Sequence, residues 1–298
     1  MVFAAPGSEI VVTPYVSTAN FIAEPTFIEV DNLVYGGTTA QNTDRLNDIL
    51  IRGSQILSDF CSQPLHAHYH SQNVIMKTRS SGNFSWHPDH NPVQLISSFG
   101  YASLLSTTGA TTFTSGSVAG AWIVNGTQVY VPFSPGSNAW STIQFGAPGG
   151  EYYTQWTYVA GYPVTTLAAA ASVGASSITV ADPTGLAVGS ILRLYEPGVG
   201  EAVTIGSTYV AGSTTVPTTT PLVNNHTAGC EATMMPSSIR QALINYASAM
   251  LMRPDATSED QWPDLHVGIS TRADDARKDG TGLVAEAYRL MRQFLRVR

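Results

Sequence analysis

The stretch LNDILIRGSQILSDFCSQPL, residues 46–65, decides how this chain is organised, because it is predicted to form an amphipathic helix. Its apolar residues recur at helical spacing; they are Leu46, Ile49, Leu50, Ile56, Leu57 and Phe60. Thr43 is a suitable N-cap, and Asp44 places a negative charge in the first turn, where the helix dipole favours it. Gly53 lies on the same stripe, although it costs about 1 kcal/mol relative to alanine, which indicates the close approach of another backbone. Pro64 ends the helix.

Two further helices are predicted near the C-terminal end. The first begins at Pro236 or Ser237 and ends before Arg253-Pro254. Its apolar stripe consists of Ile239, Leu243, Tyr246, Ala247, Met250 and Leu251. The second covers residues 283–297, and its apolar side consists of Leu283, Ala287, Leu290, Met291, Phe294 and Leu295. Helices of this length are not stable alone in water, so we expect all three to pack on one another.

The middle of the chain is predicted to form β structure in two blocks. In the first, residues 66–160, the segment AWIVNGTQVYV predicts a hairpin, because Asn125-Gly126 supplies the positive φ angles of a tight turn. Ser141–Phe145 and Glu151–Val159 are predicted as further strands. The second block, residues 164–232, has short strands on either side of an Asp-Pro-Thr-Gly turn, and nothing in it suggests catalysis.

These elements predict an α+β fold, in which a small helical bundle built from the N- and C-terminal helices carries inserted antiparallel β units. Residues 1–37 are expected to be an extended N-terminal arm. Residues 38–65 and 233–298 form the helical bundle in this interpretation. Residues 66–163 form a first β domain, and residues 164–232 form a small inserted β domain.

Composition excludes several classes of protein. The chain has 298 residues, of which 43% are apolar, so it can bury a large core. Its net charge of −7 argues against a free-standing nucleic-acid binder, which is normally basic. Two cysteines are too few for a disulfide scaffold. The sequence contains neither a run of 18 apolar residues nor a recognisable signal peptide, so we expect no membrane partner and a reducing, cytoplasmic environment.

Charge is unusually sparse between residues 71 and 230. The charged residues there are Lys77, Arg79, Arg193, Asp89, Glu151, Asp182, Glu196 and Glu201. Eight charges in 160 residues are few for a surface that stays soluble alone. Burial against neighbouring subunits explains this, and solvation by Ser, Thr, Asn and Gln is the alternative.

The candidate metal ligands are histidines. His66, His68 and His70 alternate, which places all three on one face of a strand, and His87 and His90 offer ligands from a second element, as zinc sites usually require. Ordinary polar positions on an exposed strand explain the pattern better, so the sequence predicts no metal site and no cofactor.

The candidate catalytic residues are weak. Cys61 lies at a helix C-terminus, where the dipole raises a thiol pKa, so a buried structural thiol is favoured over a nucleophile. Glu196 and Glu201 bracket Pro197–Gly200, and a turn between strands is favoured over an acid/base pair. The sequence therefore predicts no catalytic residue and no enzyme.

Three segments together resemble the head–tail connector, or adaptor, proteins of long-tailed bacteriophages. Leu46–Leu65 resembles the first helix of that family, which ends in an aromatic-Cys pair. Tyr158–Pro163, YVAGYP, resembles the tyrosine–glycine turn that closes its β excursion, and Met235–Arg253 resembles the helix that follows. The terminal LMRQFLRVR suits its C-terminal helix. Residues 164–232 depart from the smallest members of the family.

The resemblance implies a structural protein of the virion neck. Such proteins form a ring, usually of twelve subunits, under the portal protein at one capsid vertex. The ring extends the channel for double-stranded DNA during packaging and ejection, and it receives a downstream head–tail stopper or tail-terminator protein. The expected location is therefore the virion neck, and the host cytoplasm during assembly. The alternatives are another β-rich virion protein, such as a tail or fibre component, and a carbohydrate-active enzyme.

The C-terminal helix carries the candidate partner-binding residues, which are Arg289, Arg292, Arg296 and Arg298. Their guanidinium groups suit carboxylates of a partner, and the resemblance places this end of the chain against the portal. Favourable placement of cations near a helix C-terminus is the alternative explanation. DNA is expected to pass through the ring without tight binding, because strong binding scales with the number of neutralised phosphates and the β blocks are poor in basic residues.

Overall fold

The computed structural model describes residues 13–26, 28–77, 83–103, 113–132, 151–252 and 281–295. Within these ranges the chain is mainly β, with thirteen strands in four antiparallel sheets and four short helices. The predicted fold class, a small helical bundle that carries inserted antiparallel β units, was therefore wrong. The helices repeat their apolar pattern over several turns, whereas many of the strands are only three to five residues long and give weak local signals. Prediction from the strongest periodicity therefore assigns the helices too large a share of the fold.

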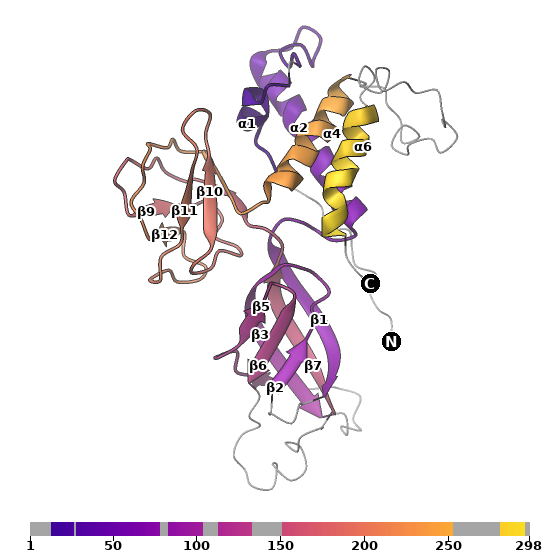
Figure 1. Cartoon of the computed structure of the whole chain (residues 1–298), viewed down its shortest axis with the longest axis vertical. Coiled ribbons are helices and arrows are strands. Elements are labelled where there is room, and N and C mark those ends of the chain that lie inside the picture. Colours follow the sequence, from indigo (N-terminus) through magenta and orange to yellow (C-terminus); the bar gives the residue numbers. More distant parts are fainter. Residues whose placement is uncertain are drawn as a thin grey trace, which may run out of the picture.

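Figure 1 shows three lobes: a helical lobe and two β lobes that extend from it. The helical lobe contains α1 (Thr18–Ala23), α2 (Thr39–Cys61), α4 (Ser237–Met252), α6 (Thr281–Met291) and the short 3₁₀ helix η2 (Arg292–Phe294). None of the helices in the described ranges is long and apolar enough to cross a membrane.

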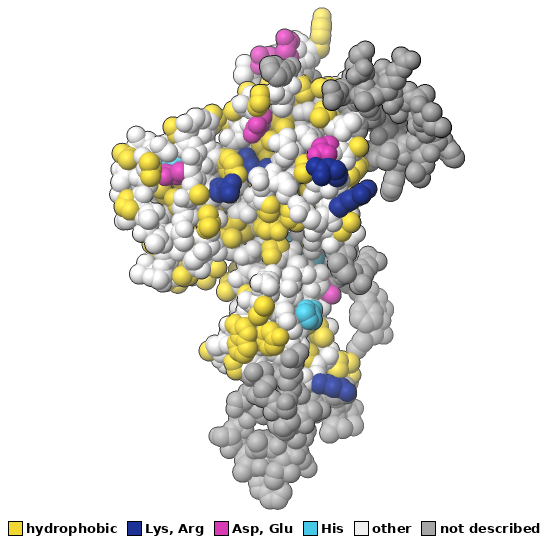
Figure 2. Space-filling model, in the orientation of Figure 1, with side chains coloured by type: hydrophobic (Ala, Val, Ile, Leu, Met, Phe, Trp, Pro, Cys, Tyr) yellow, Lys and Arg dark blue, Asp and Glu magenta, His cyan; other side chains and the backbone are white. Residues whose placement is uncertain are grey.

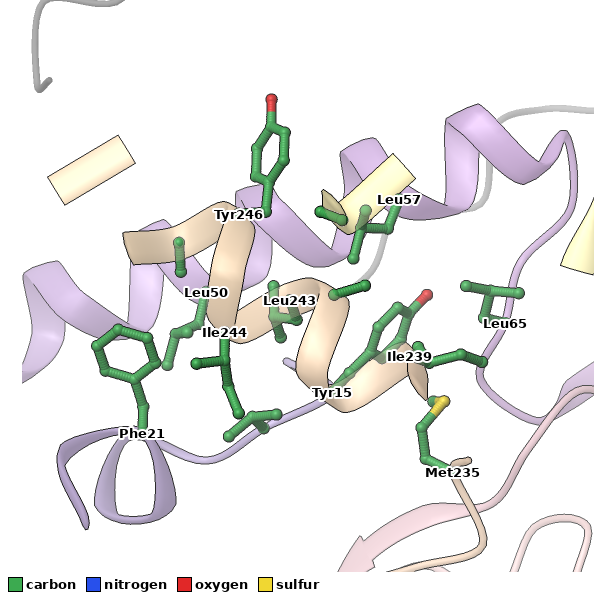
Figure 3. Close-up of a cluster of buried hydrophobic side chains, with 14 of the residues drawn as sticks. Tyr15, Phe21, Leu50, Leu57, Leu65, Met235, Ile239, Leu243, Ile244 and Tyr246 are labelled. Atoms are coloured by element: carbon green, nitrogen blue, oxygen red, sulfur yellow. The ribbon is translucent and has the colours of Figure 1, made fainter. Parts of the chain in front are cut away.

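Helix α2 packs against α4 and α6, so segments from both ends of the chain share one core. Figure 3 shows this core, in which Leu50 and Leu57 of α2 and Leu243 and Ile244 of α4 are among the buried side chains. A Cβ added to Gly53 would lie 2.8 Å from Leu243 Cδ1. The close approach predicted at Gly53 is thus made by a side chain of α4 rather than by its backbone.

The start of α2 differs from the prediction. Thr38, not Thr43, is the N-cap: its side chain accepts a hydrogen bond from Gln41 N, and the Gln41 side chain accepts one from Thr38 N. This reciprocal capping box satisfies two backbone donors that the helix leaves open. Thr43 lies inside the helix, and its hydroxyl donates to Thr39 O. The helix ends at Cys61, before Pro64, with Ser62 in the left-handed conformation.

The region expected to be an extended arm contains helix α1 and packs on its own chain. Tyr15, Val16 and Phe21 are buried in the helical core, and Tyr15 N donates to Ser54 Oγ of α2 at 3.1 Å. The described part of this segment is therefore held by the same chain.

The first β lobe follows α2. One sheet has the order β1-β7-β3-β4 and consists of β1 (His68–Lys77), β7 (Glu151–Ala160), β3 (Val93–Ser103) and β4 (Thr114–Gly116). The other has the order β2-β6-β5 and consists of β2 (Asn83–Trp86), β6 (Gln128–Pro132) and β5 (Trp122–Val124). Stacked aromatic rings fill the core between them, among them Trp156 against Trp86 and Phe99.

Two of the sequence predictions in this lobe can be compared with the structure. The predicted hairpin is confirmed: β5 pairs with β6, and Asn125 and Gly126 have φ angles of 51° and 68°. The strand predicted at Glu151–Val159 is β7. The strand predicted at Ser141–Phe145 lies outside the described residues.

The second β lobe has its own core and leads into α4. Its larger sheet has the order β11-β10-β13-β8 and consists of β11 (Glu201–Thr204), β10 (Ile191–Tyr195), β13 (Glu231–Thr233) and β8 (Val164–Thr166). The smaller sheet pairs β12 (Thr215–Pro217) with β9 (Ser177–Thr179). The predicted turn after β9 is present, with Gly185 at a φ angle of 79°.

A buried ion pair joins this lobe to the helices. Glu231 of β13 contacts Arg240 of α4, and their side chains are only 3% and 5% exposed. Glu231 also accepts hydrogen bonds from Ser17 N at 2.9 Å and from Asn20 Nδ2 at 2.7 Å. The Arg240 guanidinium lies over the Tyr195 ring, 3.7 Å from its centroid. The N-terminal segment, α4 and the second β lobe therefore meet at one pair of opposite charges.

Candidate functional site

A buried histidine in the second β lobe lies between two carboxylates and a thiol. Glu196 directly follows β10, Glu201 begins β11, and Cys230 directly precedes β13. His226 Nδ1 lies 3.0 Å from Glu196 Oε2 and 3.9 Å from Cys230 Sγ. His226 Nε2 lies 2.9 Å from Glu201 Oε1. Both nitrogens of a fully buried imidazole are thus matched to groups that attract a positive charge.

The backbone fixes these side chains in place. His226 exchanges two backbone hydrogen bonds with Ala171, at 2.8 and 2.9 Å. Cys230 O accepts from Leu167 N at 2.8 Å. Because β10 pairs with both β11 and β13, the three segments that carry the four side chains lie next to one another.

Hydrogen bonds hold both carboxylates in their charged form. The pKa of Glu196 is lowered, mainly because the Thr227 hydroxyl donates to it at 2.7 Å. Burial raises the pKa of Glu201, but the backbone N–H groups of Val223 and Asn224 together with the contact with His226 outweigh it, and the net shift is downward. Burial, with Glu196 nearby, raises the pKa of Cys230 to about 12. At neutral pH the cluster therefore presents two carboxylates and a protonated thiol around one histidine.

Only part of this cluster was predicted from the sequence. The predicted turn after Glu196 is present, because Val199 N donates to Glu196 O at 3.1 Å. That this turn brings Glu196 and Glu201 to His226 was not predicted. The signal available in the sequence was the spacing of His226 and Cys230, four residues apart with a glycine between them. By itself that spacing is too common to identify a site.

The predicted histidines His66, His68 and His70 form a contiguous cluster at the start of β1. The ring centroids of His66 and His68 are 5.1 Å apart, and those of His68 and His70 are 3.7 Å apart. His90 stacks on His70 at 3.9 Å, so it supplies the predicted second element, whereas His87 is exposed and faces Thr127 O. Within the described ranges, the group of residues whose ligand atoms all lie within 4.8 Å is instead Glu196, His226 and Cys230.

Acidification is expected to destabilise the chain through His68. Burial lowers its pKa to about 4, with a smaller contribution from His66 and His90, although its hydrogen bond to His66 O opposes this shift; His70 and Tyr158 also line the cluster. The unfolded chain binds a proton near pH 6.5 and the folded chain only near pH 4, so stability falls as the pH drops between these values. We expect a loss of roughly 1–2 kcal/mol after a discount for partial exposure.

Urea unfolding at pH 7.5 and pH 4.5 measures this loss. In His68→Gln the difference between the two pH values should shrink by about 1 kcal/mol or more, whereas the exposed His87→Gln variant should behave like the natural chain. An unchanged pH dependence in His68→Gln would show that His68 does not titrate as stated.

The four arginines of the C-terminal segment are only partly described. Arg289 is exposed and pairs with Glu286 of the same helix at 2.6 Å, and Arg292 is exposed on η2. Arg296 and Arg298 lie outside the described residues. The same helix buries Ala287 and Met291 in the core, so deleting it would disturb folding, and exchange of the arginines to serine is the cleaner test of partner binding.

Cys61 has the properties of a structural thiol. It is completely buried, burial raises its pKa to about 12, and its Sγ lies 3.8 Å from Met291 O. A nucleophilic cysteine needs a lowered pKa and access to substrate, so the geometry gives Cys61 no such role.

No family model and no curated protein matches this sequence.

Proposed function

We propose that this chain is a structural protein of the virion neck. It assembles into a ring that joins the portal protein to the downstream stopper or tail-terminator protein and extends the DNA channel. It therefore acts in the virion, and in the host cytoplasm during assembly. The proposal starts from the resemblance of Leu46–Leu65, Tyr158–Pro163 and Met235–Arg253 to connector proteins.

The surface of the two β lobes is the observation that supports this proposal most. Figure 2 shows lobes covered mainly by uncharged polar and apolar atoms, with few charged side chains on the face in view. Large apolar side chains are exposed on strand faces, among them Tyr69 and Ile75 of β1, Trp122 of β5 and Ile191 of β10. Apolar side chains with few charges around them are typical of surfaces that neighbouring subunits cover.

The contacts of such a ring are heterologous, since each subunit offers two different surfaces to its neighbours. The outward face of β1 is suited to one of them. Its exposed residues alternate along ten positions, and Lys77 is the only charged one among them. Strand surfaces that stay exposed to solvent usually carry more charged side chains. The exposed arginines Arg289 and Arg292 remain the candidate contacts to the portal, where complementary charge would speed docking and fix the register.

The mainly β architecture also favours a second candidate function. A tail or fibre component of a virion is commonly built from such sheets, and it would share the charge-poor surface. The two candidates differ in assembly, because a neck protein closes into a flat ring whereas a fibre forms a trimeric rod. The shape of the assembled particle therefore separates them.

DNA binding is expected to be weak and sensitive to salt. A channel protein that gripped phosphates would slow packaging and ejection, and the β lobes offer few basic groups to do so. Fluorescence anisotropy with a labelled DNA duplex at physiological salt measures the affinity. We expect a Kd weaker than about 1 µM, in the range of non-specific binders. Nanomolar affinity for duplex DNA would contradict the proposed passive channel.

A further inference from the structure

We propose that the second β lobe holds a zinc ion between Glu196, His226 and Cys230, with Glu201 fixing the orientation of the histidine. Ligand atoms of the first three residues all lie within 4.8 Å of one another. Carboxylate oxygen, imidazole nitrogen and thiolate sulfur are the three ligand types that zinc accepts in proteins. The inference rests on this geometry alone and does not depend on the proposed neck function.

The spacing of the ligand atoms suits a tetrahedral ion. Zinc bonds of about 2.0–2.1 Å to nitrogen or oxygen and about 2.3 Å to sulfur place neighbouring ligand atoms about 3.3–3.8 Å apart. His226 Nδ1 lies 3.0 Å from Glu196 Oε2 and 3.9 Å from Cys230 Sγ. Both distances lie within a few tenths of an ångström of this range, and the ligand atoms of Glu196 and Cys230 lie within 4.8 Å of each other. The Glu196 side chain is 18% exposed, so water can reach the fourth position.

The second nitrogen of His226 has the partner that metal-binding histidines usually have. A ligating histidine commonly donates its other N–H to a carboxylate, which fixes the ring and strengthens the ligand. Here His226 Nε2 lies 2.9 Å from Glu201 Oε1, and Glu201 is itself held by the N–H groups of Val223 and Asn224. This contact points to an ion on the Nδ1 side of the ring, and it is independent of the spacing of the ligand atoms.

The charge balance also favours a cation. A neutral imidazole carries one N–H, so it can donate to only one of the two carboxylates that face it. A zinc ion bound at Nδ1 removes this conflict, because Nε2 then donates to Glu201 while Nδ1 and Glu196 bind the metal. Binding also displaces the Cys230 proton to solvent, so one proton is released for each ion bound. The alternative is an imidazolium paired with both carboxylates, with no metal.

Cobalt serves as a spectroscopic probe for the zinc site. The full-length chain is stripped with a chelator and titrated with Co²⁺ and then with Zn²⁺. We expect one Co²⁺ per chain, with a near-ultraviolet thiolate-to-cobalt absorption band that Zn²⁺ removes. Cys230→Ser should lose this band, and Cys61→Ser, which changes the other buried cysteine, should keep it. Glu201→Gln should keep the band and bind 10–100-fold more weakly, as expected when an orienting partner is lost.

Two results would overturn the proposal. The first is the absence of a thiolate band in the folded natural chain at saturating Co²⁺, which would leave His226 in an ion pair alone. The second is a band that persists in Cys230→Ser, which would place the cobalt elsewhere. The first result is obtained with the natural chain and needs no variant. The second is a bound cobalt ion in Cys230→Ser, so it can be interpreted directly from the absorption band.

Discussion

Gly161→Ala is expected to destabilise the chain by about 3 kcal/mol or more, enough to prevent folding of a marginally stable protein. Gly161 has a φ angle of 102°, which side-chain-bearing residues rarely adopt. A Cβ there would lie 2.2 Å from His66 O and 2.9 Å from Ala67 N, and both are backbone atoms. Neither can move, because Tyr162 N donates to Leu65 O at 2.7 Å and Ala67 N donates to Tyr162 O at 2.9 Å.

Gly174→Ala is the matched control. Gly174 also has a positive φ angle, of 83°, but a Cβ there would meet nothing within 4 Å. It should lose only about 1 kcal/mol, the cost of the backbone conformation. Thermal unfolding followed by tryptophan fluorescence compares the two variants. Equal losses of stability in the two variants would show that residues 65–67 and 161–162 pack less closely than described.

Breaking the buried pair of Glu231 and Arg240 should cost about 3–5 kcal/mol, because the partner left behind is a buried and unpaired charge. Glu231→Gln keeps the shape of the side chain and removes its charge, and Arg240→Met keeps most of the apolar packing. Each variant also weakens the attachment of the N-terminal segment, since Glu231 accepts from Ser17 N and Arg240 Nη1 donates to Tyr15 O at 3.1 Å. Chemical denaturation measures the loss.

Glu286→Gln provides the control for this pair. It breaks the pair with Arg289, in which the Arg289 and Glu286 side chains are 65% and 42% exposed. Exposed pairs contribute little because water screens them, so no measurable change in stability is expected. If Glu231→Gln were as mild as Glu286→Gln, the three parts of the chain would not depend on the buried pair.

The elements that local sequence determines were predicted well. The apolar stripe of α2, the Asn125-Gly126 turn and the strand β7 depend on residues close in the chain, and each is present. The N-cap was misplaced by five residues, because Thr38 and Thr43 are both suitable caps and only Thr38 has Gln41 three residues later.

The features that were missed depend on long-range pairing. Residues 13–26 could be recognised as bound to their own chain only through Tyr15 and Phe21, whose partners lie far along the sequence. His226 meets Glu196 and Glu201 across 30 and 25 positions, because β10 pairs with both β11 and β13. No local pattern encodes that register, so the candidate metal site was not predictable even though its turn was.

Imaging of the purified full-length chain by negative-stain electron microscopy, over a range of concentrations, tests the proposed neck function most directly. We predict flat, closed rings with a central channel and a uniform number of subunits, for which the connector resemblance implies twelve. Trimeric rods would contradict the proposal that this chain forms a neck ring, as would particles that remain monomeric at every concentration together with monomer-like packing of the chain in an intact virion.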